Sequence, residues 1–193
     1  SHEMFAYDWV LDPTPETTSI RIYGINETQV NRTICLRIEN FKPYAYIQLP
    51  DNKDSTARII FDHLQSLRQP PVKIKMVKKY HLYNFENKGN KSKPFMFTAF
   101  DSKKQISDMV FNLKKGIHIY GRLVKIKVHE IAANPILQLT SLRNIPMAGW
   151  IDFSNECSVP ENERITSCDE EYIVKWRNLS KSDRVGQVVP KCI

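Results

Sequence analysis

The chain has 193 residues, of which 41% are apolar and 25% charged, and its net charge is +7. This is enough apolar material for one domain or two small lobes. No run approaches the roughly 18 apolar residues of a membrane span, and no charged-then-apolar leader opens the chain, so we expect a soluble protein with no membrane partner. The four cysteines are widely spaced and form no C-x-x-C pair, which predicts reduced thiols in an intracellular setting.

The positive charge is concentrated in one segment. Half of the 28 Lys and Arg lie between Lys73 and Lys127, where only three acidic residues occur, so this segment carries +11 while the flanks carry −2 each. Aromatic residues are interleaved with the cations. A local positive field that contains flat rings is typical of nucleic-acid binding, and its density exceeds what solubility requires.

The first third of the chain predicts strands followed by a helix. Alternating or β-branched runs predict strands at 5–11, 19–25, 33–38 and 44–49. Apolar residues from Ala57 to Leu67 then recur at spacings of three and four, which predicts a helix with one buried stripe. Asp54 or Ser55 would cap this helix, and Pro70 would end it.

The basic segment continues with strand and helix signals. The predicted elements are a long strand at 72–85, a basic loop at 86–93, a strand at 94–100, a helix from 101 or 102 to Gly116, and a strand or strand pair at 117–128 broken near Tyr120-Gly121. From Tyr44 to Val128 the order is strand, helix, strand, strand, helix, strand. This is the order of ferredoxin-like, RNA-recognition-type α+β folds, which leave one sheet face free for bases.

The remainder is less regular. It predicts a short helix at 136–142, strands at 151–153 and 172–176, a polar loop at 154–170 and an outgoing linker at 178–190. We therefore expect two lobes. The RNA-recognition-like lobe would span 43–142, and a smaller, mostly-β lobe would combine 4–42 with 143–193, because neither part alone has enough apolar surface. Residues 1–3 look like a cloning remnant.

Three aromatic residues are candidates for base stacking. The segment 93–100 fits the RNA-recognition sheet signature at its basic position and at all three aromatic positions, but misses at three others. Phe95 and Phe97 would share a sheet face with Tyr46 on the neighbouring strand. Each ring could stack a base at about 1 to 3 kcal/mol. The alternative is that this face is covered and the three rings are core.

The candidate phosphate-binding residues are the cations of the predicted strands. They are Lys73, Lys75, Lys78, Lys79, Lys93, Arg122, Lys125 and Lys127. If two or three of them meet phosphates, binding should weaken with salt at a slope of about −0.7 per contact on a single strand. The alternative is that these charges only solvate a strand face.

No constellation of residues predicts catalysis or a metal site. Two-metal phosphoryl transfer needs converging carboxylates, but the acidic residues cluster only at 169–171, in what reads as a solvated loop. The five histidines are scattered and lack metal-ligand spacing. We expect no catalytic residue, metal or cofactor in this chain.

Several motifs together resemble a known family. They are Phe41-Lys42-Pro43-Tyr44-Ala45-Tyr46-Ile47, Tyr80-His81-Leu82-Tyr83, Asn134-Pro135 and Ile145-Pro146-Met147-Ala148-Gly149-Trp150. Their order and spacing resemble the amino-terminal domain of family B DNA polymerases, nearest to the delta-type or large-DNA-virus branch. The resemblance implies a non-catalytic domain of a DNA-directed DNA polymerase, which supports a 3′–5′ exonuclease domain and contacts the single-stranded template.

The resemblance also implies the surroundings of the domain. Its partners would be DNA and the exonuclease and polymerase domains of the same parent chain, for which Mg²⁺ would be the cofactor. It would act in the nucleus or cytoplasm, or at a viral replication site. Residues 188–193 resemble the segment that directly precedes the Asp-x-Glu motif of the 3′–5′ exonuclease domain. Two alternatives stay open, an independent RNA- or single-stranded-DNA-binding module and a structural docking domain.

Overall fold

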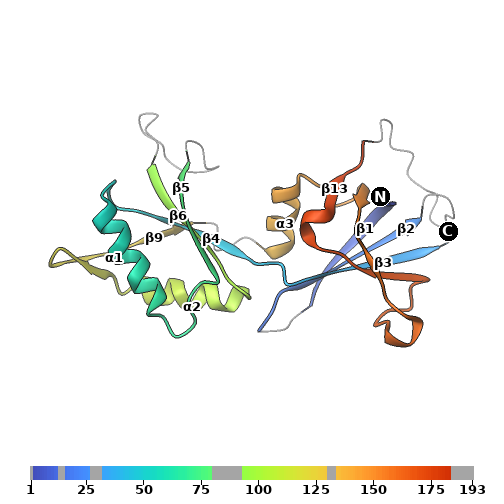
Figure 1. Cartoon of the computed structure of the whole chain (residues 1–193), viewed down its shortest axis with the longest axis horizontal. Helices are drawn as coiled ribbons and strands as arrows, with labels where there is room; N and C mark the ends of the chain where they lie inside the picture. Colours follow the sequence, from blue (N-terminus) through green and yellow to red (C-terminus); the bar gives the residue numbers. More distant parts are fainter. Residues whose placement is uncertain (1, 13–15, 27–31, 80–92, 130–133, 184–193) are drawn as a thin grey trace. The chain divides into compact units, whose positions relative to one another are not determined.

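A computed structural model describes residues 2–12, 16–26, 32–79, 93–129 and 134–183. The chain forms two compact units: unit 1 comprises Ser1–Phe41 and Asn134–Ile193, and unit 2 comprises Lys42–Ala133 (Figure 1). The predicted continuation of the strand past residue 79, most of the basic loop, the motif at 80–83 and the lead-in at 188–193 lie outside the described residues. No helix in the described ranges is both long and apolar enough to cross a membrane.

Unit 1 is built on a seven-stranded sheet. Its strands are β1 (His2–Asp12), β2 (Ser19–Asn26), β3 (Thr33–Glu39), β10 (Gly149–Phe153), β11 (Cys157–Ser158), β12 (Glu170–Ile173) and β13 (Leu179–Lys181), in the order β11-β12-β3-β2-β1-β10-β13. All neighbours are antiparallel except β12 and β3. Ile20, Ile22, Leu36 and Ile38 are fully buried at alternate positions, as a strand with one apolar face requires.

Helix α3 (Pro135–Arg143) belongs to unit 1, so the two units differ from the expected lobes in two respects. The lobe boundary expected after residue 142 falls after Ala133, because α3 packs on β1 and β13. The β-rich lobe, expected to be the smaller one, spans more of the chain than unit 2. The helix itself is confirmed, and the Asn134 side chain caps it by accepting the N–H of Ile136 at 2.8 Å.

The expected linker at 178–190 contains a strand. β13 pairs with β10, Leu179 lies opposite Phe153 and is fully buried, and Arg143 Nε donates to the Leu179 carbonyl at 2.8 Å. Three residues are too few to show an alternating pattern, so this strand depends on its tertiary partners. The strand expected at 172–176 is shifted to Glu170–Ile173, and a short 3₁₀ helix at Trp176–Asn178 follows.

Unit 2 is a four-stranded antiparallel sheet with two helices. The elements are β4 (Tyr44–Gln48), α1 (Asp54–Gln65), β5 (Lys73–Lys79), β6 (Lys93–Ala99), α2 (Lys103–Leu113), a hairpin of β7 (Ile117–Ile119) and β8 (Arg122–Val124), and β9 (Lys127–His129). The sheet order is β5-β6-β4-β9. Ala45, Ile47 and Met96 pack against Ile60 of α1 and Ile106 of α2, so both helices cover the same face (Figure 1).

The ends of the two helices differ in part from the prediction. The N-cap of α1 is Lys53, not Asp54 or Ser55, and the Asp51 carboxylate accepts the Lys53 N–H at 2.9 Å. Ser102 is the N-cap of α2, but its side chain makes no capping hydrogen bond. After α2, Gly116 adopts a φ of 84°, where a side chain is strained, and its N–H donates to Leu113.

Candidate nucleic-acid interface

Unit 2 turns one set of sheet side chains away from its helices. Directly opposed residues of an antiparallel pair project to the same face. Tyr46 lies opposite both Phe97 and His129, and Phe97 lies opposite Lys75, so these four residues share a face. We call it the ring face. Its members are Tyr44, Tyr46, Gln48, Lys73, Lys75, Val77, Phe95, Phe97, Ala99, Lys127 and His129.

Five rings of this face form one contact network. The ring centroids of Tyr44 and Phe97 are 5.4 Å apart, those of Tyr46 and Phe97 5.5 Å, and those of Phe95 and His129 5.7 Å. Tyr46 also meets Tyr44 and Phe95 edge to face. Such contacts stabilise a cluster by about 0.5 to 1.5 kcal/mol per pair beyond area burial. The rings therefore fix one another's orientation.

Burial separates the three rings expected to stack bases. Tyr46 is 6% and Phe95 4% exposed, so neither presents an open ring surface. Their burial favours the alternative that they are packed as core. Phe97 is half-buried and is the stacking candidate with an accessible part. Base stacking by Phe97 stays a prediction.

The ring face carries exposed cations at both sheet edges. Lys73 and Lys75 lie on β5 and Lys127 lies on β9, and all three are exposed. Alternation along β5 places these lysines on the ring face and Ile74 on the helix face. None of the three lysines forms an ion pair with a carboxylate of the described residues. A polyanion crossing this face could reach charge on either side of Phe97.

Two other predicted cations lie outside the ring face. Arg122 lies on the separate β7–β8 hairpin and Lys125 follows it, and both are exposed. The backbones of Lys78, Lys79 and Lys93 belong to β5 and β6, but their side chains lie outside the description. Of the five predicted cations whose side chains are described, three therefore lie on the ring face.

Sequence reasoning missed three polar or aromatic members of the ring face. Tyr44, Gln48 and His129 join the face, and His129 Nε2 lies 3.0 Å from Gln48 Oε1. The signal for Tyr44 and Gln48 was present, because each is two positions from Tyr46 in the same strand. His129 could have been placed only by knowing that β9 pairs with β4.

The acidic group at 169–171 is structural, and its prediction as a solvated loop is wrong for Glu171. This residue lies in β12 and is 1% exposed. Its carboxylate accepts from Thr166 Oγ1 at 2.7 Å, from the backbone N–H groups of Thr166 and Ile165, and from Arg37 at 3.4 Å. Burial alone would raise the pKa of Glu171, but these donors outweigh it and hold the pKa below its ordinary value.

The neighbouring Asp169 has a similar role. It accepts the Thr33 N–H at 2.9 Å, which together with the Thr33 hydroxyl lowers the pKa of Asp169. Within the described ranges, no three or more His, Cys, Asp and Glu side chains are grouped so that they could hold a metal ion. The arrangement of acids therefore holds the loop before β12 onto β3.

The chain has relatives among viral DNA polymerases. No family model matches it. It is 32% identical to DNA polymerase 037L of Invertebrate iridescent virus 6, and the match covers 94% of this chain and 17% of that protein. It is 28% identical to putative DNA polymerase 060R of Frog virus 3, and that match covers 96% of this chain and 16% of the viral protein. It is also 26% identical to the DNA polymerase of Phaeocystis pouchetii virus. The chain thus spans about a sixth of the length of these relatives.

A solved structure shares the fold. The family B DNA polymerase from the archaeon Pyrobaculum calidifontis superposes with a TM-score of 0.67 at 11% identity, over 96% of this chain and 21% of that one. The resemblance read from the motifs is confirmed by both comparisons. The chain is thus similar in sequence to a part of the DNA polymerases of large DNA viruses, and it shares its fold with a part of a family B DNA polymerase.

Proposed function

We propose that the chain is a non-catalytic amino-terminal domain of a DNA-directed DNA polymerase, which contacts single-stranded template through the ring face and supports the exonuclease domain. The support is the homology to viral DNA polymerases together with the cations of unit 2. In this proposal the parent polymerase uses Mg²⁺, its other domains and DNA are the partners, and it acts in the nucleus, the cytoplasm or a viral replication site.

We also assign unit 2 to the ferredoxin-like, RNA-recognition-type arrangement. The chain order is β4-α1-β5-β6-α2-β9 and the sheet order is β5-β6-β4-β9, with both helices on one face. A split β-α-β fold of this kind commonly presents the face without helices to nucleic acid.

One observation carries the proposed DNA contact. Lys73, Lys75 and Lys127 are exposed, have no carboxylate partner in the described part of the chain, and lie on the same face as half-buried Phe97. An ammonium group that meets a phosphate releases a condensed counterion, so each contact adds affinity at low salt. Because Tyr46 and Phe95 are buried, we assign most of the binding to charge and little to stacking.

A competing account explains the same lysines without DNA. β5 and β9 are the two edges of the sheet, and lysines on edge strands discourage pairing with other chains. This account, and a purely structural docking domain, both predict no binding to nucleic acid at physiological salt. An independent RNA-binding module would bind RNA at least as well as DNA.

The experiment is a titration of labelled oligodeoxythymidine with the chain, followed by fluorescence anisotropy between about 50 and 200 mM salt. We expect the logarithm of the binding constant to fall with the logarithm of the salt concentration at a slope near −2, from three contacts at about −0.7 each. Neutralising all three lysines in K73Q/K75Q/K127Q should lower the affinity by about 100-fold near 0.1 M salt. The matched control is Lys104→Gln on α2, whose ammonium already pairs with Asp108 at 3.4 Å.

Three outcomes would contradict the proposal. Absence of DNA binding, or a loss of affinity in K104Q equal to that in the triple variant, would favour the edge-protection or docking accounts. Tighter binding of an oligouridine competitor would favour an RNA-binding module. The polymerase assignment has a separate test, because the parent gene should encode the Asp-x-Glu of an exonuclease shortly after Ile193. Another sequence there would refute the assignment whatever the titration shows.

A further inference from the structure

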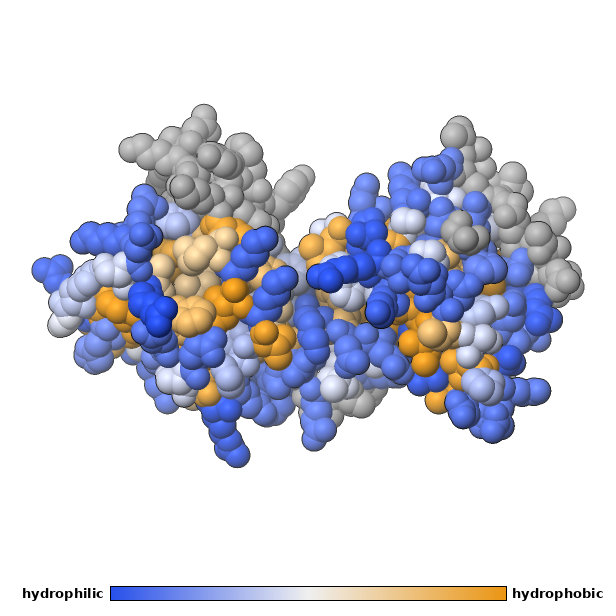
Figure 2. Space-filling view, viewed as in Figure 1, coloured by the Kyte–Doolittle hydropathy of each residue, from blue (hydrophilic) through white to orange (hydrophobic). Residues whose placement is uncertain are grey.

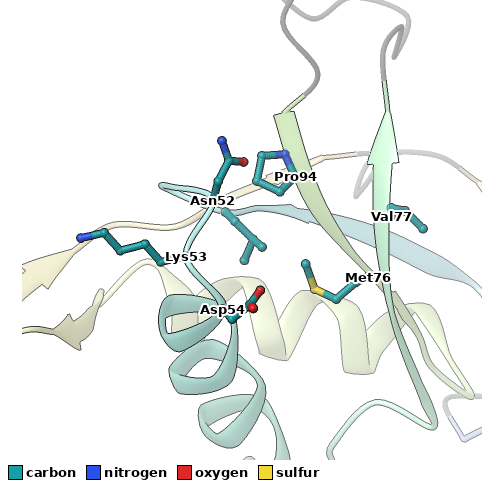
Figure 3. A pocket seen from close by; sticks show the side chains of 8 residues that line it. Asn52, Lys53, Asp54, Met76, Val77 and Pro94 are labelled. Atoms are coloured by element: carbon teal, nitrogen blue, oxygen red, sulfur yellow. The ribbon is translucent and has the colours of Figure 1, made fainter.

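A groove follows the seam between helix α1 and the edge strand β5. It consists of two adjoining pockets of about 560 and 250 Å³, which share Asp54, Ala57 and Met76 in their walls. Figure 3 shows the larger pocket, with Asp54 of α1 and Met76 of β5 pointing toward one another across it. The smaller pocket adds Phe61 and Ile74. The groove thus has one wall from a helix and one from a sheet edge.

The walls of this groove expose apolar side chains. Met76 is 48% exposed and Ile74 is half-buried. Alternation and the pairing of Met76 with buried Met96 place both on the helix side of β5. In Figure 2 an apolar patch lies over this part of unit 2, with hydrophilic residues around it. An apolar patch with a polar rim commonly marks a binding surface.

The outer edge of β5 is available for pairing. β5 bonds to β6 on one side, and within the described residues no strand pairs with its other side. Free N–H and C=O groups of an edge strand are a template on which an extended peptide can add as a further strand. In that binding mode, pockets beside the edge receive every second side chain of the peptide.

We propose that β5 and the groove bind an extended segment of a partner protein in which apolar residues alternate with Asp or Glu. In an added strand, one set of side chains would fall beside Ile74 and Met76 and enter the groove. The other set would fall beside Lys73 and Lys75 on the ring face, where carboxylates complement the two ammonium groups. The lysines that discourage a neutral or basic strand from pairing therefore favour an acidic one.

This inference differs from the proposed DNA contact in the residues it requires. Met76 belongs to the groove alone, because it lies on the helix side of β5. Lys127 belongs to the DNA contact alone, because it lies on β9 at the other sheet edge. Lys73 and Lys75 serve both, so peptide and DNA are expected to compete.

The test uses three labelled peptides and the 193-residue chain. The probe alternates Glu and Val, one control has the same residues in two blocks, and the other alternates Lys and Val. We expect the Glu-Val peptide to bind about tenfold tighter than either control. Met76→Glu should weaken its binding about tenfold, because a charged side chain would then stand where the apolar Val side chains enter the groove. Lys127→Gln should leave peptide binding unchanged while lowering DNA affinity.

A charge swap tests the inference without altering the groove. In K73E/K75E, whose substitutions are on exposed positions, the preference should reverse toward the Lys-Val peptide. Equal affinity for the block peptide, or an unchanged preference in the charge swap, would overturn the inference. If the M76E variant keeps its circular-dichroism spectrum and binds the Glu-Val peptide as tightly as the unmodified chain does, the groove is not the peptide site. Loss of DNA binding with unchanged peptide binding would contradict only the proposed function.

Discussion

The two units use their charged residues differently. In unit 1 the ion pairs join Arg21 to Asp12, Arg32 to Glu170, and Arg37 to both Glu39 and Glu171, at 2.6 to 3.4 Å. In unit 2 the lysines of the ring face have no such partner among the described residues, and the pairs Arg58–Asp62 and Lys104–Asp108 lie on exposed helix surfaces. The arginines of unit 1 link residues of neighbouring strands, whereas Lys73, Lys75 and Lys127 of unit 2 have no carboxylate partner in the described ranges and can meet a ligand. Lys42 of unit 2 does pair with Asp101.

This difference shows why a count of charges does not identify a binding site. An exposed ion pair contributes about 0 to 1 kcal/mol, while removing one partner of a buried network costs about 3 to 5 kcal/mol. The same residue type is therefore structural in one unit and available in the other, depending on burial and on what lies opposite it. Four measurements test this contrast between the two units.

The largest effect is expected at Glu171. Replacement by Ala removes the acceptor of three hydrogen bonds from Ile165 and Thr166 and leaves Arg37 without this carboxylate. We expect E171A to lower the free energy of unfolding by about 3 kcal/mol. All three tryptophans, Trp9, Trp150 and Trp176, belong to unit 1, so urea unfolding followed by tryptophan fluorescence reports on that unit. Exposed Glu161→Ala is the control, and an equal effect there would contradict the structural role.

A smaller effect is expected in how the stability contributed by Glu171 depends on pH. The pKa of folded Glu171 lies below its ordinary value of 4.5, so the carboxylate stabilises the fold fully above that value and less as the pH falls through the folded pKa. The stability difference between the wild type and Glu171→Gln should therefore be constant near neutrality and shrink below about pH 4.5. Urea midpoints of both proteins measured from neutral to acid pH test this, and a difference that grows on acidification would refute it.

A still smaller effect is expected at Tyr172. Its hydroxyl donates to Glu170 at 2.7 Å, and burial, followed by this bond and the charge of Glu170, raises the pKa of Tyr172 to about 12. Tyr172→Phe should lower the stability of unit 1 by about 1 kcal/mol. Ultraviolet titration should also lose one phenol with a pKa of about 12. An unchanged alkaline titration would show that the hydrogen bond is not formed.

The smallest effect is expected at the lysines of the ring face. Because they have no partner in the described part of the chain, K73Q/K75Q/K127Q should leave thermal unfolding nearly unchanged, or raise the midpoint slightly by relieving repulsion. A clear loss of stability, comparable to that of E171A, would mean that these lysines are structural and would remove the contrast between the two units.

Much of the local structure could be predicted from residue patterns. The early strands and helices α1, α2 and α3 follow from apolar spacing, and Pro135 at the start of α3 is typical of a first helical turn. The ring-face positions of Phe95 and Phe97 follow from the two-residue period of a strand. The helix caps were less reliable, because Asp51 acts from outside α1 and the cap position itself is Lys53.

The candidate site was predicted only in part. The sequence identified the basic segment and three of the rings and left open whether the rings stack bases or form core, and burial favours the core alternative for Tyr46 and Phe95. Whether a ring on a strand is accessible depends on what covers the face, and no pattern within the strand records that. The solvated loop expected at 169–171 was wrong for Glu171 for the same reason, since this residue is buried where β12 pairs with β3, far away in the chain.

The sequence by itself determined most of the strands and helices, the concentration of charge and the family resemblance, because each depends on neighbouring residues and their spacing. Tertiary structure decided which charges are paired. Arg37 and Glu171 lie 134 positions apart and meet only because β12 adds in parallel to β3. It likewise brought β9 beside β4, which places Lys127 and His129 on the ring face. Pairings between distant segments depend on the whole fold, so they cannot be read from local periodicity.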